Sequence, residues 1–173
     1  NPDVFREIVE IFLKLSNKGI QMIRLDAIPF MWKEVGTTCR NLPKIHDLMK
    51  MMKLIAEIVT PSVVLLGEAI VEPEEIVGYF GKSEPECQMM YNATGMVNIW
   101  NSLATRNVQL LNTDFHRLKL PEWGCWIQYA RCHDDIGWGF NESAISNMGF
   151  SPKDHKQFLI QFYEGMFDGS FSK

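Results

Sequence analysis

The sequence lacks the features that define several classes of protein. No apolar run reaches the length of a membrane span, because charged or polar residues interrupt every hydrophobic stretch. Positive charge is not in excess either, since 17 Lys and Arg stand against 21 Asp and Glu and give a formal net charge of -4. A basic footprint for nucleic acid is therefore missing. We expect neither nucleic acid nor a membrane as a partner.

Cysteine is sparse, and its spacing does not suggest a metal centre. The four cysteines form no Cys-x-x-Cys pair and have no histidine at zinc spacing. We expect reduced thiols packed as small apolar groups, no bound metal and a cytoplasmic location. The first residues do not resemble a secretion signal. What remains is a chain with 46% hydrophobic and 22% charged residues, which is typical of a globular domain with a buried core.

Hydrophobic spacing predicts alternating helices and short strands. No repeat or linker interrupts this pattern, so we expect a single domain. Apolar residues at helical spacing predict helices over residues 1–18, 43–59, 73–80, 97–111 and 151–162. Short apolar runs predict strands over residues 20–26, 63–66 and 126–130. Helices alternating with apolar strands indicate an α/β fold with a parallel sheet covered by helices.

Charged residues follow each of the three predicted strands. The first strand ends in Asp26, the second runs into Glu68, and the third leads to His133 and Asp134. The carboxyl ends of parallel strands in an α/β barrel meet at one rim, where active sites are assembled. We therefore expect these side chains to come together.

Two carboxyl groups at such a rim suit the cleavage of glycosides with retention of configuration. That reaction needs one carboxylate as nucleophile and a second, protonated carboxyl as acid. Arg24 lies two residues before Asp26, so both point to the same face of a strand, and its charge favours an ionised Asp26. Taken alone, the Arg24 and Asp26 pair is more typical of an ordinary ion pair at a strand end than of a catalytic site. Charged residues after three successive predicted strands together favour a catalytic site.

At these residues the chain resembles the α-amylase family of glycoside hydrolases. Residues 19–27, 66–69 and 131–135 are similar to three of the family's signature segments. The resemblance implies that Asp26 is the nucleophile and Glu68 the acid/base. It also implies that Asp134 stabilises the transition state, while Arg24 and His133 bind the sugar.

Longer stretches narrow the resemblance to the sucrose-using amylosucrases. They comprise residues 30–39, 67–71, 103–106, 133–138 and 167–171. The resemblance implies sucrose as donor, a covalent glucosyl-enzyme, an α-1,4-glucan as acceptor and release of fructose. It implies no coenzyme and no nucleotide sugar. Ile70 and Asp135 would lie on the acceptor side.

The resemblance covers part of a barrel. The family's first signature is not found, and we expect a partial (β/α)8 TIM barrel with about the fourth to seventh strand–helix units. Residues 137–173 would begin a subdomain inserted after the seventh strand. We expect a fragment of a larger enzyme, with little activity on its own. A sucrose hydrolase or another α-glucosidase remains an alternative, as does an inactive barrel relative, although all three carboxylates are present.

Overall fold

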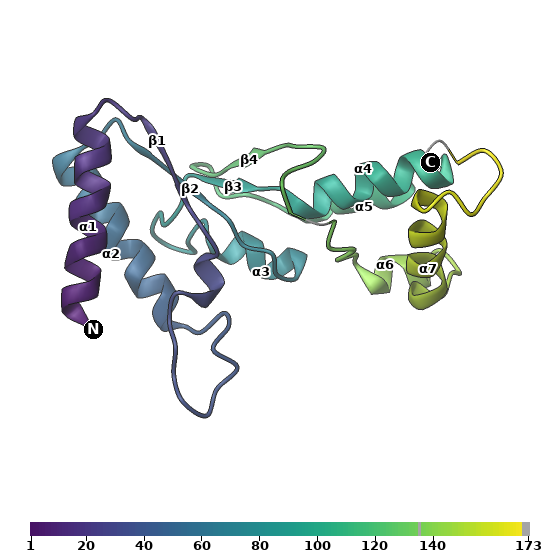
Figure 1. Cartoon of the computed structure of the whole chain (residues 1–173), viewed down its shortest axis with the longest axis horizontal. Helices are drawn as coiled ribbons and strands as arrows, with labels where there is room; N and C mark the ends of the chain where they lie inside the picture. Colours follow the sequence, from purple (N-terminus) through teal and green to yellow (C-terminus); the bar gives the residue numbers. More distant parts are fainter. Residues whose placement is uncertain (135, 171–173) are drawn as a thin grey trace. The chain divides into compact units, whose positions relative to one another are not determined.

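The computed structural model describes residues 1–134 and 136–170, so Asp135 and residues 171–173 lie outside the described part. Its elements, labelled in Figure 1, are α1 (Pro2–Asn17), β1 (Met22–Leu25), the 3-10 helix η1 (Ile28–Phe30), α2 (Lys44–Val59), β2 (Val64–Gly67), α3 (Pro73–Gly78), β3 (Met89–Tyr91), α4 (Ala93–Thr105), α5 (Gln109–Arg117), β4 (Cys125–Ile127), α6 (Glu142–Asn147) and α7 (Pro152–Tyr163). They form two compact units. The sheet unit comprises Asn1–Val71, Glu75–Tyr91 and Leu120–Ile127. The helical unit comprises Glu72–Glu74, Asn92–Lys119 and the described residues from Gln128 onwards.

The sheet unit contains four parallel strands in the order β1-β2-β3-β4. Leu25 of β1 is opposite Gly67 of β2, and Gly67 is opposite Met90 of β3. The register therefore aligns the carboxyl ends of the first three strands. The predicted α/β architecture, a parallel sheet with helices, is confirmed.

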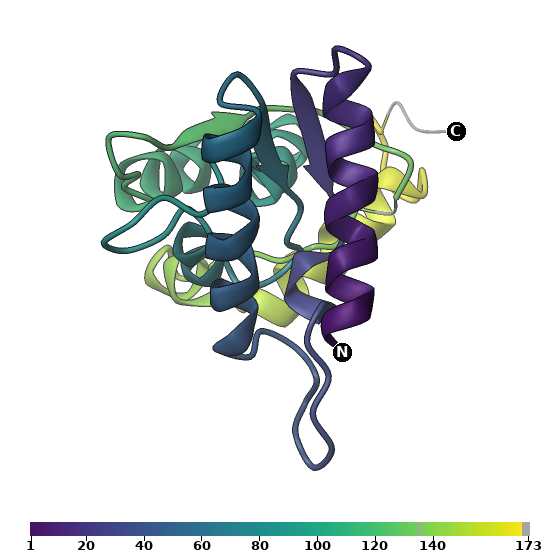
Figure 2. The ribbon, with the colours of Figure 1, turned by 90° about the vertical axis from the view of Figure 1, so that its left-hand side faces the viewer.

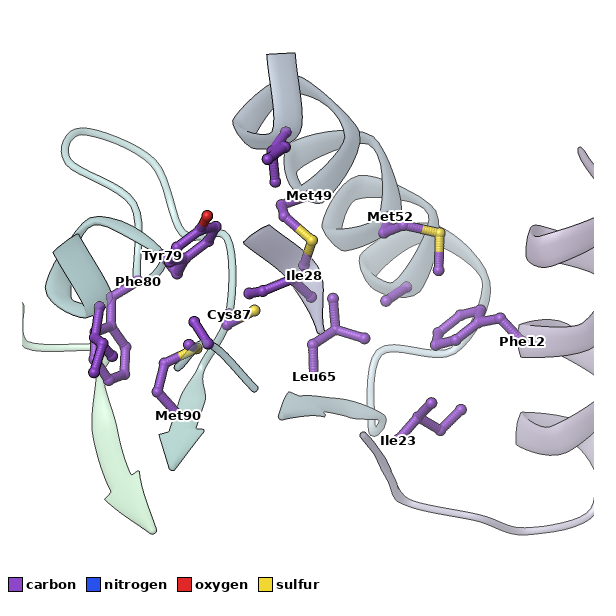
Figure 3. Close-up of a cluster of buried hydrophobic side chains, with 14 of the residues drawn as sticks. Phe12, Ile23, Ile28, Met49, Met52, Leu65, Tyr79, Phe80, Cys87 and Met90 are labelled. Carbon is purple, nitrogen blue, oxygen red and sulfur yellow. The ribbon is translucent and has the colours of Figure 1, made fainter. Parts of the chain in front are cut away.

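Helices α1 and α2 cover one face of this sheet, which we call the helix face (Figure 2). Successive side chains of a strand point to opposite faces, and Ile23, Leu65 and Met90 point to the helix face. Figure 3 shows them in one buried cluster with side chains from the helices, namely Phe12, Met49 and Met52. Burial of this apolar surface is the main term that holds the helices on the sheet.

Close packing on the helix face requires glycine at the end of β2. A Cβ at Gly67 would lie 2.5 Å from Met90 Sδ and 3.0 Å from Ile28 Cδ1. A side chain there would force its neighbours apart. Gly67 thus lets β2 sit against the core immediately before Glu68.

The first two helices begin and end close to their predicted positions. Asn1 caps α1, since its side chain accepts a hydrogen bond from the Asp3 N–H at 2.9 Å, and Pro2 follows in the first turn. Gly19 has φ 84° and follows the last turn of α1. Helix α2 begins at Lys44, directly after Pro43.

The third and fourth strands differ from the prediction. The sequence pattern does not predict β3, because a strand of three residues is too short to show a period. The strand predicted over residues 126–130 is instead β4, Cys125–Ile127. Strand β4 ends earlier than predicted because its partner strand ends. Ile127 pairs with Tyr91, which is the last residue of β3. His133 and Asp134 therefore do not directly follow a strand.

The single helix predicted over residues 97–111 is wrong, since the structure has two helices there. Helix α4 ends at Thr105, because the next residue, Arg106, has a left-handed φ of 54° that cannot continue a right-handed helix. The Asn107 side chain then accepts a hydrogen bond from the Gln109 N–H at 2.8 Å, where α5 begins. The apolar pattern continues through this break and conceals it.

The helical unit has a core of its own, formed by side chains from α4, α5, α6 and α7 and by Phe140, which precedes α6. The buried members are Met96, Val97, Leu110, Phe140, Ala144, Ile145 and Leu159. Asn98 is also buried, and its side-chain amide donates to Asp114 Oδ2 at 2.8 Å. That hydrogen bond joins α4 to α5 within the unit. The inserted subdomain predicted from residue 137 stays a prediction.

The structure bears on two expectations from the sequence, namely reduced cysteines and the lack of a membrane-spanning segment. All four cysteines are free thiols. Burial raises the pKa of the Cys87 thiol to about 12, so it packs as a neutral, apolar group. Among the described residues, no helix has the length and apolar character needed to cross a membrane.

Candidate active site

Arg24 joins the two carboxylates at the ends of β1 and β2. Its Nη2 atom lies 2.9 Å from Asp26 Oδ1 and 2.7 Å from Glu68 Oε1. Arg24 points away from the helix face because its neighbour Ile23 points into it. The sequence therefore predicted correctly that Arg24, Asp26 and Glu68 come together, and the aligned strand ends explain why.

The backbone after β1 fixes the distance between the two carboxylates. Ala27 adopts a left-handed conformation with φ 47°, and its N–H donates to Glu68 Oε2 at 3.4 Å. The backbone N–H of Glu68 donates to the carbonyl of Leu25 at 3.0 Å, and the N–H of Ile28 donates to the carbonyl of Glu68 at 3.1 Å. The turn that carries Asp26 is thus bonded directly to the end of β2.

The two carboxylates differ in their exposure to solvent. The Asp26 side chain is 70% exposed, whereas the Glu68 side chain is 14% exposed. The hydrogen bond to Glu68 raises the pKa of Arg24, and the charge of Asp26 acts in the same direction while burial opposes it. Arg24 is therefore a permanent cation. The exposed Asp26 and the shielded Glu68 share the Arg24 cation, and their different exposure suits them to different roles in a reaction.

His133 and Asp134 belong to the helical unit, so their approach to the Arg24 cluster stays a prediction. His133 Nε2 lies 3.5 Å from Asp134 Oδ1, and both side chains are open to solvent. The Arg131 guanidinium donates to the backbone carbonyl of Asp134 and closes this turn. Of the expected acceptor-side residues, Ile70 follows Glu68 in the sheet unit and is 53% exposed, and Asp135 lies outside the described residues.

The turn at His133 also offers ligand atoms to a metal. The Cys132, His133 and Asp134 ligand atoms lie within 4.8 Å of one another. The three residues are adjacent in sequence and lie in an open turn, and such groups commonly gather without an ion. The resemblance implies that His133 binds the sugar and that Asp134 stabilises the transition state, so we assign no metal to them.

Tyr91 is a site residue that the sequence pattern did not indicate. The Arg24 Cζ atom lies 5.8 Å from the centroid of the Tyr91 ring. Tyr91 ends β3, the strand that was not predicted. An aromatic residue after two methionines and before the N-cap Asn92 was the available signal, and it is weak.

The chain has relatives among enzymes of known activity, although no family model matches it. It is 33% identical over 138 residues to a glucosylglycerate phosphorylase of Escherichia coli (strain K12), a match that covers 79% of this chain and 25% of that protein. A glucosylglycerate phosphorylase of Spirochaeta thermophila is 42% identical over 140 residues, covering 79% of this chain and 23% of that protein. A trehalose synthase of Thermus thermophilus is 30% identical over 138 residues, a match that covers 79% of this chain and 14% of that protein.

A solved structure supports the fold. The structure of sucrose 6F-phosphate phosphorylase from Thermoanaerobacter thermosaccharolyticum matches with a TM-score of 0.68 and 21% identity, covering 88% of this chain and 29% of that one. The neighbour is a (β/α)8-barrel enzyme, and the predicted partial barrel is confirmed.

The relatives indicate a broader class of enzymes than the amylosucrases that the sequence resembles. The chain is related to phosphorylases and synthases of the α-amylase family. It spans about a quarter or less of the length of the curated relatives described above. Amylosucrase in particular is not shown by these relatives.

Proposed function

We propose that this chain is the catalytic part of a retaining enzyme that transfers glucosyl groups. Asp26 is the nucleophile and Glu68 the acid/base, as the family resemblance implies. Asp134 stabilises the transition state, Arg24 and His133 bind the sugar, and Ile70 and Asp135 face the acceptor. Because the relatives are longer, we propose that the chain is part of a larger barrel, here called the complete enzyme.

The observation that carries this proposal is the separation of the two carboxylates. Asp26 Oδ1 and Glu68 Oε1 contact the same Arg24 nitrogen at 2.9 and 2.7 Å, so they lie at most about 5.6 Å apart. Retaining glycosidases place the two groups roughly 5–5.5 Å apart, whereas inverting enzymes need roughly 6.5–9.5 Å to admit a water. The measured limit supports retention, with a covalent intermediate.

In the first step, a carboxylate oxygen of Asp26 attacks the anomeric carbon of the donor. The bond from that carbon to the leaving oxygen breaks, and Glu68 gives its proton to this oxygen. The product is a glucosyl ester of Asp26. Asp26 is exposed and so accessible to the sugar, whereas the Glu68 side chain is shielded from solvent.

In the second step, Glu68 acts as the base. An acceptor hydroxyl attacks the anomeric carbon, gives its proton to Glu68 and releases the Asp26 carboxylate. Two displacements at one carbon restore the original configuration. With sucrose as donor and an α-1,4-glucan as acceptor, the products are fructose and a longer glucan.

A second candidate differs in the acceptor and, if glucosylglycerate is the substrate, also in the donor. The relatives include glucosylglycerate phosphorylases, and the structural neighbour is a sucrose 6F-phosphate phosphorylase. Their names favour inorganic phosphate as the group that intercepts the glucosyl-enzyme. The same Asp26 and Glu68 pair would then release glucose 1-phosphate.

Product analysis of the complete enzyme separates these functions. The enzyme is incubated with sucrose, with and without a glucan and with and without phosphate, and the sugars are followed over time. Fructose in excess of glucose with growth of the glucan supports the first candidate. Glucose 1-phosphate formed only with phosphate, from sucrose or glucosylglycerate, supports the second. Equal fructose and glucose identifies a hydrolase, and no reaction with any donor contradicts the proposal.

A further inference from the structure

We infer that Tyr91 is a positioning residue, whose ring holds the Arg24 guanidinium in the orientation that bridges Asp26 and Glu68. The inference rests on the proposed function for its effect on catalysis. The orientation itself rests only on contacts within the sheet unit.

The strand register places Tyr91 beside the carboxylates. Met90 is opposite Gly67, so Tyr91 stands level with Glu68, the next residue of the neighbouring strand. Met90 is fully buried on the helix face, which directs Tyr91 to the opposite face together with Arg24. The pairing of Tyr91 with Ile127 of β4 holds the other side of β3.

Arg24 therefore has three neighbours that come from three successive strands. Two are carboxylates, and the contact of each is to the same nitrogen, Arg24 Nη2. The third is the Tyr91 ring, 5.8 Å from Arg24 Cζ. A planar guanidinium near an aromatic face is attracted by cation–π forces worth about 0.5–2 kcal/mol, depending on exposure. The ring thus adds a third contact that holds the guanidinium beside the two carboxylates.

The restraint has a chemical consequence. Asp26 must be ionised and aimed at the anomeric carbon, and its Oδ1 lies 2.9 Å from Arg24 Nη2. If Arg24 turns towards solvent, Asp26 loses this cation. Tyr91 then affects formation of the glucosyl-enzyme without touching the sugar.

The test compares Tyr91→Phe with Tyr91→Leu in the complete enzyme. Phenylalanine keeps the aromatic face, whereas leucine keeps apolar volume without one. The first measurement is NMR of arginine side chains with selective 15N labelling, assigned by Arg24→Lys. We expect a ring-current shift of the Arg24 Nε–H signal in the wild type and in Tyr91→Phe, and its loss in Tyr91→Leu. No shift in the wild type, or no change in Tyr91→Leu, overturns the inference whether or not the protein processes glucosides.

The second measurement is the single-turnover rate of glucosyl-enzyme formation across pH. We expect Tyr91→Leu to be about 10-fold slower at each pH, the scale of a cation–π contact. Tyr91→Phe should stay within about 3-fold of the wild type, and the melting temperatures of both variants should agree. Equal loss in both variants assigns the effect to the hydroxyl and overturns the inference. A wild type that forms no glucosyl-enzyme refutes the proposed function but leaves the NMR result to decide on Tyr91.

Discussion

Arg24 and Glu68 lie on neighbouring strands, and Arg24 Nη2 is 2.7 Å from Glu68 Oε1. The same nitrogen reaches Asp26, the residue that follows β1. One cation therefore fixes both carboxylates that the proposed reaction needs, and Ala27 adds a backbone donor to Glu68. Each element of this arrangement can be altered separately.

Replacing Arg24 should impair catalysis far more than folding. In Arg24→Lys the shorter ammonium cannot keep both contacts, and charge-assisted hydrogen bonds contribute about 1.5–3 kcal/mol each. We expect kcat/KM of the complete enzyme to fall about 100-fold. Steady-state kinetics between pH 4 and pH 9 would check this.

Arg6→Lys is the matched control for that variant. Arg6 also contacts a carboxylate, Asp3 Oδ1 at 2.6 Å, but both side chains are exposed on α1. Exposed ion pairs contribute little. We expect activity and melting temperature to be unchanged, and equal losses in the two variants would argue against a special role for Arg24.

Substitution of Gly67 tests the packing behind the site. In Gly67→Ala the new Cβ would meet Met90 Sδ at 2.5 Å, so the core must shift. Overpacking of this kind costs about 1–3 kcal/mol, which lowers the melting temperature by several degrees. Gly137→Ala is the control, because among the described residues, its chain neighbours aside, no atom lies within 4 Å of its Cβ position. Thermal unfolding of both variants gives the comparison, and equal melting temperatures would contradict the packing described.

Glu68→Gln should separate the two steps of the reaction. The amide cannot give a proton to a leaving sugar, so we expect sucrose cleavage to fall by about 100- to 10,000-fold. Glucosyl fluoride needs no proton for departure, so it should still form the glucosyl-enzyme, and added azide should release it. Rates with both donors are measured in parallel. An equal loss with both donors would remove Glu68 from the acid/base role.

The helical unit should become less stable in mild acid because of His155. Its Nε2 lies 2.7 Å from Asn101 Oδ1, and burial lowers the pKa of His155. The unfolded chain then binds the proton more readily than the folded one below the ordinary value of 6.5. Stability should be full above that pH and fall as pH decreases towards the lowered folded value.

The variant His155→Gln can keep the contact to Asn101 but does not titrate. We expect the fall in melting temperature between pH 8 and pH 5 to be smaller in this variant than in the wild type. Calorimetry at both pH values would check this. The same pH dependence in both proteins would show that another group is responsible.

The sequence predicted the part of the site that depends on strand ends. Short apolar runs followed by Asp26 and Glu68 are enough, because parallel strands align their carboxyl ends. The Arg24 contact followed from the two-residue period of a strand. Strand β3 could not be predicted, since three residues show no period, and Tyr91 was missed with it.

Two other differences have local causes that a pattern does not reveal. The break between α4 and α5 depends on the left-handed backbone of Arg106, a residue that usually favours helix. The early end of β4 depends on where β3 ends. Both are set by neighbours rather than by the residues of the segment itself. The left-handed Ala27, which bonds to Glu68, is of the same kind.

The most direct test of the account is to find which residue becomes covalently attached to the sugar. The complete enzyme is reacted with a fluorinated glucosyl fluoride that slows the second step, then digested and analysed by mass spectrometry. The account predicts one glucosyl ester, on the peptide that contains Asp26, and no ester in Asp26→Asn. An ester on another carboxylate, or cleavage with inversion and no ester at all, would contradict it.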